Sequence, residues 1–186
     1  MTGDVATASR GSGPLLVVMG VSAAGKSTVA RTLAAQLGIS YVDADDLHPT
    51  ANVEKMARGV PLSDEDRWPW LDRVGQELKD APAEGVVMAC SALRRSYRDR
   101  LRGAAPNVGF IHLTGTRELL RERAAGRADH FMPTTLLDSQ LDTLERLEGD
   151  ETGIRIDIDA TVENIALAAR EWVASRDCDR DKTGAA

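Results

Sequence analysis

A glycine-bounded octapeptide near the start of the chain limits its possible folds more than any other feature. Residues 20–27 read Gly-Val-Ser-Ala-Ala-Gly-Lys-Ser, which fits the pattern G-x-x-x-x-G-K-[ST]. The unbroken apolar run of residues 15–19 precedes this pattern, as in a strand that is covered on both faces. Apolar residues then recur every four positions over residues 29–37, and Gly38 is typical of a helix end. The sequence therefore predicts a strand, a phosphate-binding loop and a helix in succession.

Each part of this loop has a separate role in holding a nucleotide. Small side chains let backbone N–H groups approach the phosphates, and the helix N-terminus favours their negative charge. Lys26 is expected to reach the β- and γ-phosphate oxygens as a catalytic group, and the Ser27 hydroxyl to bind Mg²⁺. We therefore predict ATP and Mg²⁺ as cofactors. The residues of this region predicted to contact the nucleotide are Gly20, Ser22, Ala23, Ala24, Gly25, Lys26, Ser27 and Thr28.

The remaining pattern alternates strands with helices. Strands are predicted over residues 39–43, 85–90, 108–113 and 154–158. Helical spacing covers residues 96–101, 118–125, 135–147 and 162–173, and one or two further helices are expected before residue 81. This order predicts a three-layer α/β sandwich with a five-stranded parallel sheet. We expect one domain at residues 14–174, with disordered extensions at residues 1–13 and 175–186.

Composition narrows the range of partners. The formal net charge is −6, so a polyanionic nucleic acid is not an expected partner. The longest apolar run is much shorter than the roughly 18 residues of a membrane span, and residues 1–13 lack the features of a signal peptide. Cys90 lies in an apolar segment and Cys178 in a charged one, a placement that indicates neither a disulfide framework nor a zinc site. We expect a cytoplasmic protein that acts on a small molecule.

Three aspartates follow the second predicted strand, in the segment Tyr41-Val42-Asp43-Ala44-Asp45-Asp46. Because side chains alternate along a strand, Asp43 and Asp45 are expected to project to the same side, into the crevice at the strand ends. We assign Asp43 to the Mg²⁺ shell and Asp45 to orienting, or accepting a proton from, the attacking hydroxyl. The alternative for both Asp45 and Asp46 is that they cap the following helix, and for Asp46 we prefer that interpretation.

Arginines spaced by four follow the third predicted strand. Arg94, Arg98 and Arg102 would share a helix face, and Arg94 lies next to the crevice, where its planar fork could hold a substrate carboxylate. For Arg98 and Arg102 we prefer a solvated basic face. For Trp68 and Trp70 we prefer a place in the core to one in the pocket wall.

The middle of the chain resembles the gluconate kinases of the thermoresistant gluconokinase type. The resemblance rests on residues 43–49, on the block Asp66-Arg67 with Pro69-Trp70-Leu71, on residues 90–99, and on His130-Phe131-Met132-Pro133 with Ser139-Gln140. It covers about residues 15–173 and implies a nucleotide-kinase-like P-loop fold, commonly dimeric. It also implies transfer of the γ-phosphate of Mg-ATP to the terminal hydroxyl of D-gluconate. The family's loop usually reads Gly-Ser where this chain has Ala23-Ala24, a departure that bears on nucleotide affinity more than on reaction type.

The same resemblance assigns further site residues. His48 and Arg67 are carried over as substrate contacts, with packing or a structural ion pair as the alternative. A mobile lid is expected at about residues 127–134. Arg123 would then stack on the adenine and Arg127 would reach the phosphates, unless both only complement a helix dipole. His130 is expected in the lid or the substrate pocket, with a surface role as the alternative.

Two other functions stay open from the sequence. A shikimate or nucleoside monophosphate kinase would share the loop, the aspartates and the lid, although the block from His48 to Leu71 disfavours it. An ATP-binding switch would gate a partner and transfer nothing.

Overall fold

Five short strands form the central sheet of the computed structural model, which describes residues 13–126 and 134–183. They are β1 (Leu15–Met19), β2 (Ser40–Asp43), β3 (Val86–Ala89), β4 (Gly109–Thr114) and β5 (Gly153–Asp157). Every pair of neighbours is parallel, in the order β2-β3-β1-β4-β5. β1 therefore has a strand on each side and helices on both faces, which explains its unbroken apolar sequence.

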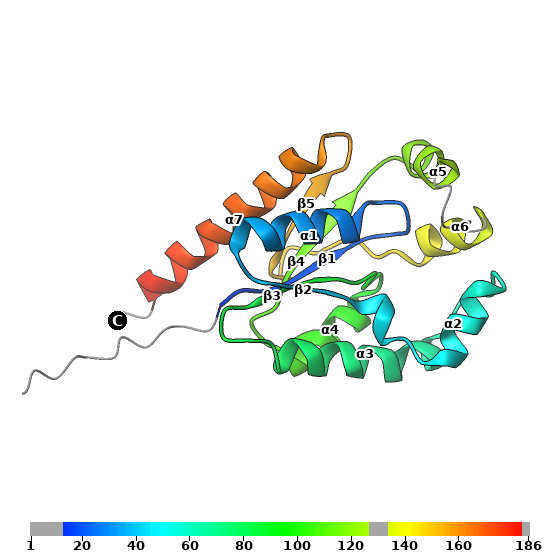
Figure 1. Ribbon diagram of the computed structural model, residues 1–186, viewed down its shortest axis with the longest axis horizontal. Helices are drawn as coiled ribbons and strands as arrows, with labels where there is room; N and C mark the ends of the chain where they lie inside the picture. Colours follow the sequence, from blue (N-terminus) through cyan, green and yellow to red (C-terminus); the bar gives the residue numbers. More distant parts are fainter. Residues whose placement is uncertain (1–12, 127–133, 184–186) are drawn as a thin grey trace, which may run out of the picture.

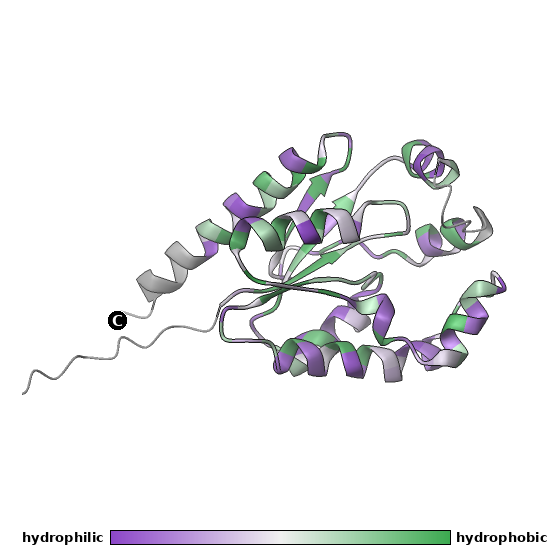
Figure 2. Ribbon diagram, viewed as in Figure 1, coloured by the Kyte–Doolittle hydropathy of each residue, from purple (hydrophilic) through white to green (hydrophobic). Residues whose placement is uncertain are grey.

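Helices cover both faces of this sheet. One face carries α1 (Lys26–Leu37) and α7 (Val162–Thr183), and the other carries α3 (Asp64–Lys79) and α4 (Arg95–Ala104) (Figure 1). The 3₁₀ helix η1 (Ala44–Leu47) follows β2. Three more helices lie near the carboxyl ends of the strands: α2 (Thr50–Ala57), α5 (Arg117–Ala125) and α6 (Thr134–Thr143). Hydrophobic residues are concentrated on the strands and on the helix sides that face them (Figure 2).

The predicted α/β fold with five parallel strands is confirmed, while two helix ends differ from their predictions. α7 continues to Thr183, so the predicted helix end at residue 173 is wrong, and the helix runs into the segment for which a disordered tail was predicted. Val173 is the last buried apolar residue among the described side chains of α7, which is where the apolar periodicity in the sequence stops, although the backbone helix continues. α6 ends at Thr143 rather than at residue 147, because the next segment bonds to a buried arginine instead.

That arginine is Arg98, which we expected on a solvated face. Its side chain is fully buried and donates two hydrogen bonds, of 2.6 and 2.8 Å, to the equally buried carboxylate of Glu151. The guanidinium also donates to the carbonyl oxygens of Ala92, Leu93, Glu145 and Arg146. Arg98 therefore joins the loop after β3 to the segment before β5. The spacing of the arginines could not predict this burial, because the carboxylate that makes it possible lies 53 residues away.

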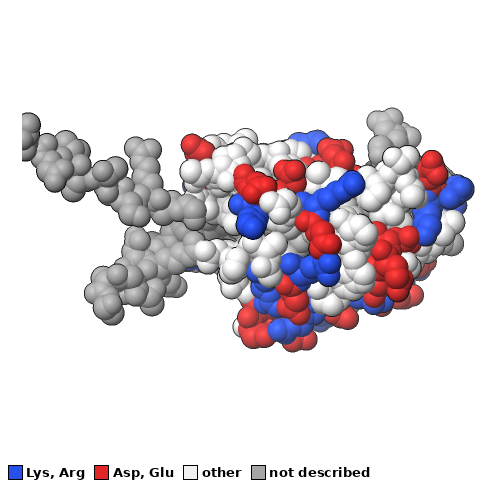
Figure 3. Space-filling view, turned by 90° about the horizontal axis from the view of Figure 1, so that it is seen from below, with Lys and Arg blue, Asp and Glu red and all other residues white. Residues whose placement is uncertain are grey.

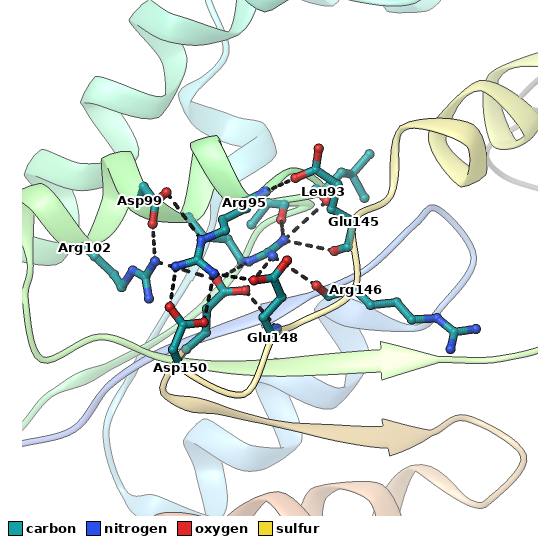
Figure 4. Close-up of polar contacts among 11 residues, drawn as sticks. Leu93, Arg95, Asp99, Arg102, Glu145, Arg146, Glu148 and Asp150 are labelled. Atoms are coloured by element: carbon teal, nitrogen blue, oxygen red, sulfur yellow. Dashed lines mark hydrogen bonds and ion pairs between the residues drawn. The ribbon is translucent and has the colours of Figure 1, made fainter.

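Exposed ion pairs surround this buried pair. Arg95 binds Glu148 and Asp150, while Arg102 contacts Asp99 (Figure 4). On the face seen from below, acidic and basic side chains are interspersed rather than gathered into a basic stripe (Figure 3). Across the described residues, no helix combines the length and apolar character needed to span a bilayer.

Candidate active site

The loop between β1 and α1 has the conformation that its two glycines allow. Gly20 has φ 140°, and a Cβ atom there would lie 2.8 Å from the carbonyl oxygen of Leu113. Gly25, the residue before α1, has φ 90° and supplies no side-chain cap. Both values lie in the region that L residues with side chains rarely adopt. The first-turn N–H groups of α1 are thus presented by a turn that only glycine fits well, as anion binding at a helix N-terminus requires.

Ala23 also has a left-handed conformation, with φ 64°. This geometry costs a non-glycine residue roughly 1–2 kcal/mol, whereas a glycine adds about 0.4–1 kcal/mol of unfolded-state entropy. We expect Ala23→Gly to raise the free energy of unfolding by about 0–1.6 kcal/mol. Ala24 is the matched control because it is buried and has no positive φ, so Ala24→Gly should lower stability by about 1 kcal/mol. Thermal denaturation without nucleotide measures both, and a loss of stability in both variants would contradict this account.

Two groups of the loop make hydrogen bonds within the protein. The Lys26 ammonium donates to the carbonyl oxygen of Val21 at 3.1 Å. The N–H of Ser22 donates to Oε1 of Gln140, on α6, at 2.6 Å. An amide oxygen thus accepts from a donor that the loop pattern assigns to phosphate. Thr28 is exposed on the first turn of α1, as its predicted nucleotide contact requires.

Ser27 and Asp43, the two predicted metal ligands, lie side by side. The Ser27 hydroxyl donates to Oδ2 of Asp43 at 2.8 Å, and the Tyr41 hydroxyl donates to the same oxygen at 2.7 Å. Burial by itself raises the pKa of Asp43, but these two hydrogen bonds, the Asp45 N–H and the charge of Lys26 together hold the pKa below its usual value. Burial and the bond to Asp43 raise the pKa of Tyr41 to about 12, so Tyr41 remains a donor. A hydroxyl and an ionised carboxylate fit Mg²⁺, which binds few protein groups together with phosphate oxygens.

Asp45 reaches the site by a different route from the one predicted. β2 ends at Asp43, so strand alternation does not extend to Asp45, which lies in η1. Neither Asp45 nor Asp46 is a cap, and the preferred interpretation of Asp46 is wrong. The cap of η1 is Asp43, whose Oδ1 accepts the Asp45 N–H at 3.2 Å. The turn of η1 still brings Asp45 to the wall of a pocket beside the phosphate loop.

This pocket brings together the phosphate loop and the predicted acceptor residues. Its volume is about 80 Å³, smaller than that of a second cavity elsewhere in the domain, so chemistry rather than size locates the site. α6 closes one side of it through Ser139 and Gln140. Its polar lining includes Ser22, Lys26, Asp45, His48, Arg67 and Gln140.

His48 is held as a neutral hydrogen-bond donor. Its ring stacks on Trp70 with centroids 4.2 Å apart, and burial, aided by the charge of Arg67, lowers the pKa of His48 to about 4. Nδ2 of Asn52 donates to the carbonyl oxygen of Asp66 and lies 3.3 Å from Nδ1 of His48. Because that nitrogen of Asn52 can only donate, Nδ1 must be the acceptor and the ring proton must be on Nε2. The His48 N–H can therefore donate to a hydroxyl or carboxylate in the pocket.

Arg67 and Arg94 meet at one carboxylate. Arg94 binds Oδ2 of Asp64 at 2.7 Å, and Arg67 lies 3.8 Å from Oδ1. Tyr97 donates to Oδ1 at 2.5 Å and accepts from Arg67 at 3.3 Å. Arg67 lines the pocket but Arg94 does not, so Arg67 is the better placed of the two for a substrate anion.

The lid residues are described only in part. Arg123 is half-buried on the last turn of α5, and its Nη2 donates to the carbonyl oxygen of Ile158 at 2.7 Å. This contact ties α5 to the end of β5, and the adenine contact stays a prediction. Arg127 and His130 lie outside the described residues.

Two buried histidines should make stability depend on pH. Burial, with added repulsion from Arg98, lowers the pKa of His112 to about 4, the same value as for His48. Between pH 6.5 and 4 the unfolded chain binds protons that the native protein does not, so stability falls as the pH falls. Each pH unit below 6.5 costs about 1.4 kcal/mol for such a group. By pH 4 the fully buried His112 should therefore lower the free energy of unfolding by about 3 kcal/mol, and the more exposed His48 should lower it by less.

Urea unfolding of the wild type and of His112→Phe at pH 7.5 and pH 4 measures this effect. The carboxylates titrate in both proteins, so the difference between the two losses of unfolding free energy gives the contribution of His112. We expect the wild type to lose about 3 kcal/mol more than the variant over this interval. Equal losses would show that His112 is protonated in the native protein well above pH 4.

Sequence reasoning missed four residues that shape the site. Tyr41 could have been found, because it precedes Asp43 by two positions on a strand and so shares its side. Trp70 lies in the core as expected, but its hydrogen bond to the Ala44 carbonyl oxygen, like that of Asn52 to the Asp66 carbonyl oxygen, joins distant segments and could not be predicted. Gln140 belongs to a block that carries the resemblance, but its contact with the phosphate loop could not be predicted, since its partner on the loop is 118 residues away.

Comparisons with known proteins agree with this fold. A family profile described as an AAA domain matches residues 15–147. The thermosensitive gluconokinase of Escherichia coli (strain K12) is 43% identical, over 87% of this chain and 88% of its own. The gluconokinase of Gluconobacter oxydans (strain 621H) is 49% identical, over 76% and 80%. The crystal structure of a gluconokinase from Sinorhizobium meliloti 1021 superposes with a TM-score of 0.85 at 40% identity, covering 94% of this chain and 99% of the other. The chain therefore belongs to the gluconokinase family.

Proposed function

We propose that this protein is a gluconate kinase, which transfers the γ-phosphoryl group of ATP to the 6-hydroxyl of D-gluconate. The observation that carries this function is one pocket lined by both Lys26 of the phosphate loop and Asp45. Phosphoryl transfer to an alcohol needs a cation at the phosphates and a carboxylate at the attacking hydroxyl, within reach of each other. Relatives at 43% and 49% identity are gluconokinases, so a shikimate or nucleoside monophosphate kinase is not favoured.

The donor side of the reaction follows from the loop. Its N–H groups and Lys26 hold the phosphate oxygens, and Lys26 must leave the Val21 carbonyl to do so. Ser27 and Asp43 would hold Mg²⁺, which when bound would supply positive charge that offsets the negative charge developing on the transferred group. Tyr41 keeps Asp43 ionised and fixed in direction, because it donates to one carboxylate oxygen. Positioning and charge stabilisation thus account for most of the catalysis on this side.

The acceptor side must recognise a carboxylate and several hydroxyls. Arg67 can meet the carboxylate of gluconate, and the Nε2–H of His48 can donate to a hydroxyl oxygen. Asp45 orients the 6-hydroxyl and accepts its proton as the new O–P bond forms. Arg94 supports this wall through Asp64, which it shares with Arg67. Arg123, Arg127 and His130 are proposed to act from the lid, on the adenine, the phosphates and the substrate respectively.

ADP release in a coupled assay tests this function. We expect release with Mg-ATP and D-gluconate, and at least 100-fold lower kcat/KM with D-glucose, shikimate or AMP. D-glucose is the sharpest control, because it keeps the 6-hydroxyl and lacks the carboxylate. A folded protein that binds ATP and releases no ADP with any acceptor would favour the nucleotide-gated switch instead. The homodimer implied by the resemblance is a separate prediction, which light scattering of the full chain would decide.

A further inference from the structure

A second cavity lies apart from the acceptor pocket, between the ends of β4 and β5 and the helices α5 and α6. Its volume is about 510 Å³, which lies within the range of small-molecule sites. Leu120, Leu141 and Leu144 give it apolar walls, and Val21 of the phosphate loop forms part of its lining. The nucleotide and acceptor groups discussed above, including Lys26 and Asp45, do not line it. The proposed reaction therefore leaves this cavity unused.

His112 of β4 is the buried polar group of this cavity. Its side chain has no exposed surface, and neither ring nitrogen has a hydrogen-bond partner among the described residues. A buried imidazole without partners is costly, and native proteins seldom keep one without a reason. As a neutral ring it has one N–H donor and one acceptor nitrogen, which a bound group could reach once the atoms that cover the ring shift.

Two arginines of the cavity lining have no side-chain partner either. Arg146 and Arg155 are exposed, and neither guanidinium makes a hydrogen bond or ion pair with another described residue. Figure 4 shows the Arg146 side chain pointing away from the ion-pair cluster around Arg95, to which Arg146 adds only its carbonyl oxygen. This separation leaves its guanidinium available at the cavity.

The other charged groups of the lining are already engaged. Arg117 binds Asp138 and Asp142. Asp157, the one carboxylate among the described lining residues, accepts the Asp159 N–H at 2.8 Å. That N–H does not neutralise the carboxylate, so Asp157 offsets one of the two positive charges of Arg146 and Arg155, and one positive charge remains in excess at the cavity. Their guanidinium groups have the planar geometry that binds phosphate and carboxylate oxygens well.

We propose that this cavity binds a small organic oxyanion, a phosphate or carboxylate group on a compact apolar body. Arg146 and Arg155 hold the anionic group, His112 forms a hydrogen bond with it, and the leucines contact the apolar part. Inorganic phosphate alone would leave most of the volume unfilled. Because Val21 belongs both to this cavity and to the phosphate loop, a bound anion would contact that loop from outside the nucleotide site.

Binding can be followed through the His112 side chain by NMR. The chain has three histidines, so His112→Phe assigns the imidazole signals directly. Phenyl phosphate and benzoate are the probes for the two anionic groups, and benzyl alcohol is the neutral control. The phosphate loop is kept filled with Mg-ADP, so that a probe phosphate cannot bind there. We expect at least one anion to shift the His112 signals in a saturable way.

Arg146→Ala/Arg155→Ala should weaken that binding at least ten-fold. Arg58→Ala/Arg170→Ala is the matched control, because it removes two exposed arginines outside the cavity and lowers the net charge equally. The control should bind as the wild type does. The proposal is overturned if neither anion shifts His112, if the cavity variant binds unchanged, or if benzyl alcohol binds as tightly as the anions. Gluconate kinase activity is measured separately and does not decide the result.

Discussion

Asp45→Asn is expected to lower kcat for gluconate phosphorylation by about 10²- to 10⁴-fold, the usual contribution of a positioned general base. The change keeps the shape of the side chain but removes its ability to take the proton of the 6-hydroxyl. Asp45 lies on the acceptor side of the pocket, and in the variant its backbone N–H can still donate to Oδ1 of Asp43, which caps η1. The dissociation constant for Mg-ATP should therefore stay within about three-fold of the wild type. Steady-state kinetics and calorimetric nucleotide titration measure the two quantities.

Asp46→Asn supplies the matched control, because Asp46 is the adjacent exposed carboxylate of the same short helix. Asp46 does not line the acceptor pocket, so the kcat of Asp46→Asn should remain within about three-fold of the wild-type value. If both variants lost activity equally, the effect would come from η1 or from local charge rather than from proton transfer. A fully active Asp45→Asn would remove Asp45 from the mechanism.

The second large effect is expected from Arg98→Ala, which should lower the free energy of unfolding by about 3–5 kcal/mol. The substitution leaves the Glu151 carboxylate buried without its cation. It also removes the donors to Ala92 and Leu93 in the loop after β3, next to pocket residue Ser91. A rise in the KM for gluconate should accompany the lost stability. Urea unfolding and acceptor kinetics at a temperature where the variant is folded measure both.

Two further variants separate burial from charge. Arg95→Ala removes an arginine from the same helix, but its partners Glu148 and Asp150 are exposed, so the loss should be about 1 kcal/mol or less. In Arg98→Met/Glu151→Leu both charges are replaced by apolar groups, and much of the lost stability should return. If Arg98→Ala were no less stable than Arg95→Ala, the role given to the buried pair of Arg98 and Glu151 would be contradicted.

The sequence alone predicted the parts that depend on near neighbours in the chain. The loop of residues 20–27 combines special backbone angles with a strand before it and a helix after it, so eight residues define both its shape and its ligand. Fully buried strands such as β1 have unbroken apolar sequences, which made the five-stranded α/β fold readable. The blocks shared with gluconate kinases then indicated the substrate. These signals come from residues close together in the chain, so they can be recognised without knowledge of the tertiary packing.

The tertiary structure decided what depends on distant partners. Arg98 is buried because Glu151 meets it across the domain, and spacing on α4 could only predict a shared helix face. His48 is a neutral donor because Trp70 and Asn52 close around it, and Gln140 reaches the phosphate loop from α6. Burial and partner geometry set the charge of these groups, and both arise only when segments far apart in the chain come together. The family and reaction could thus be read from the sequence, whereas the state of each catalytic and supporting group required the folded protein.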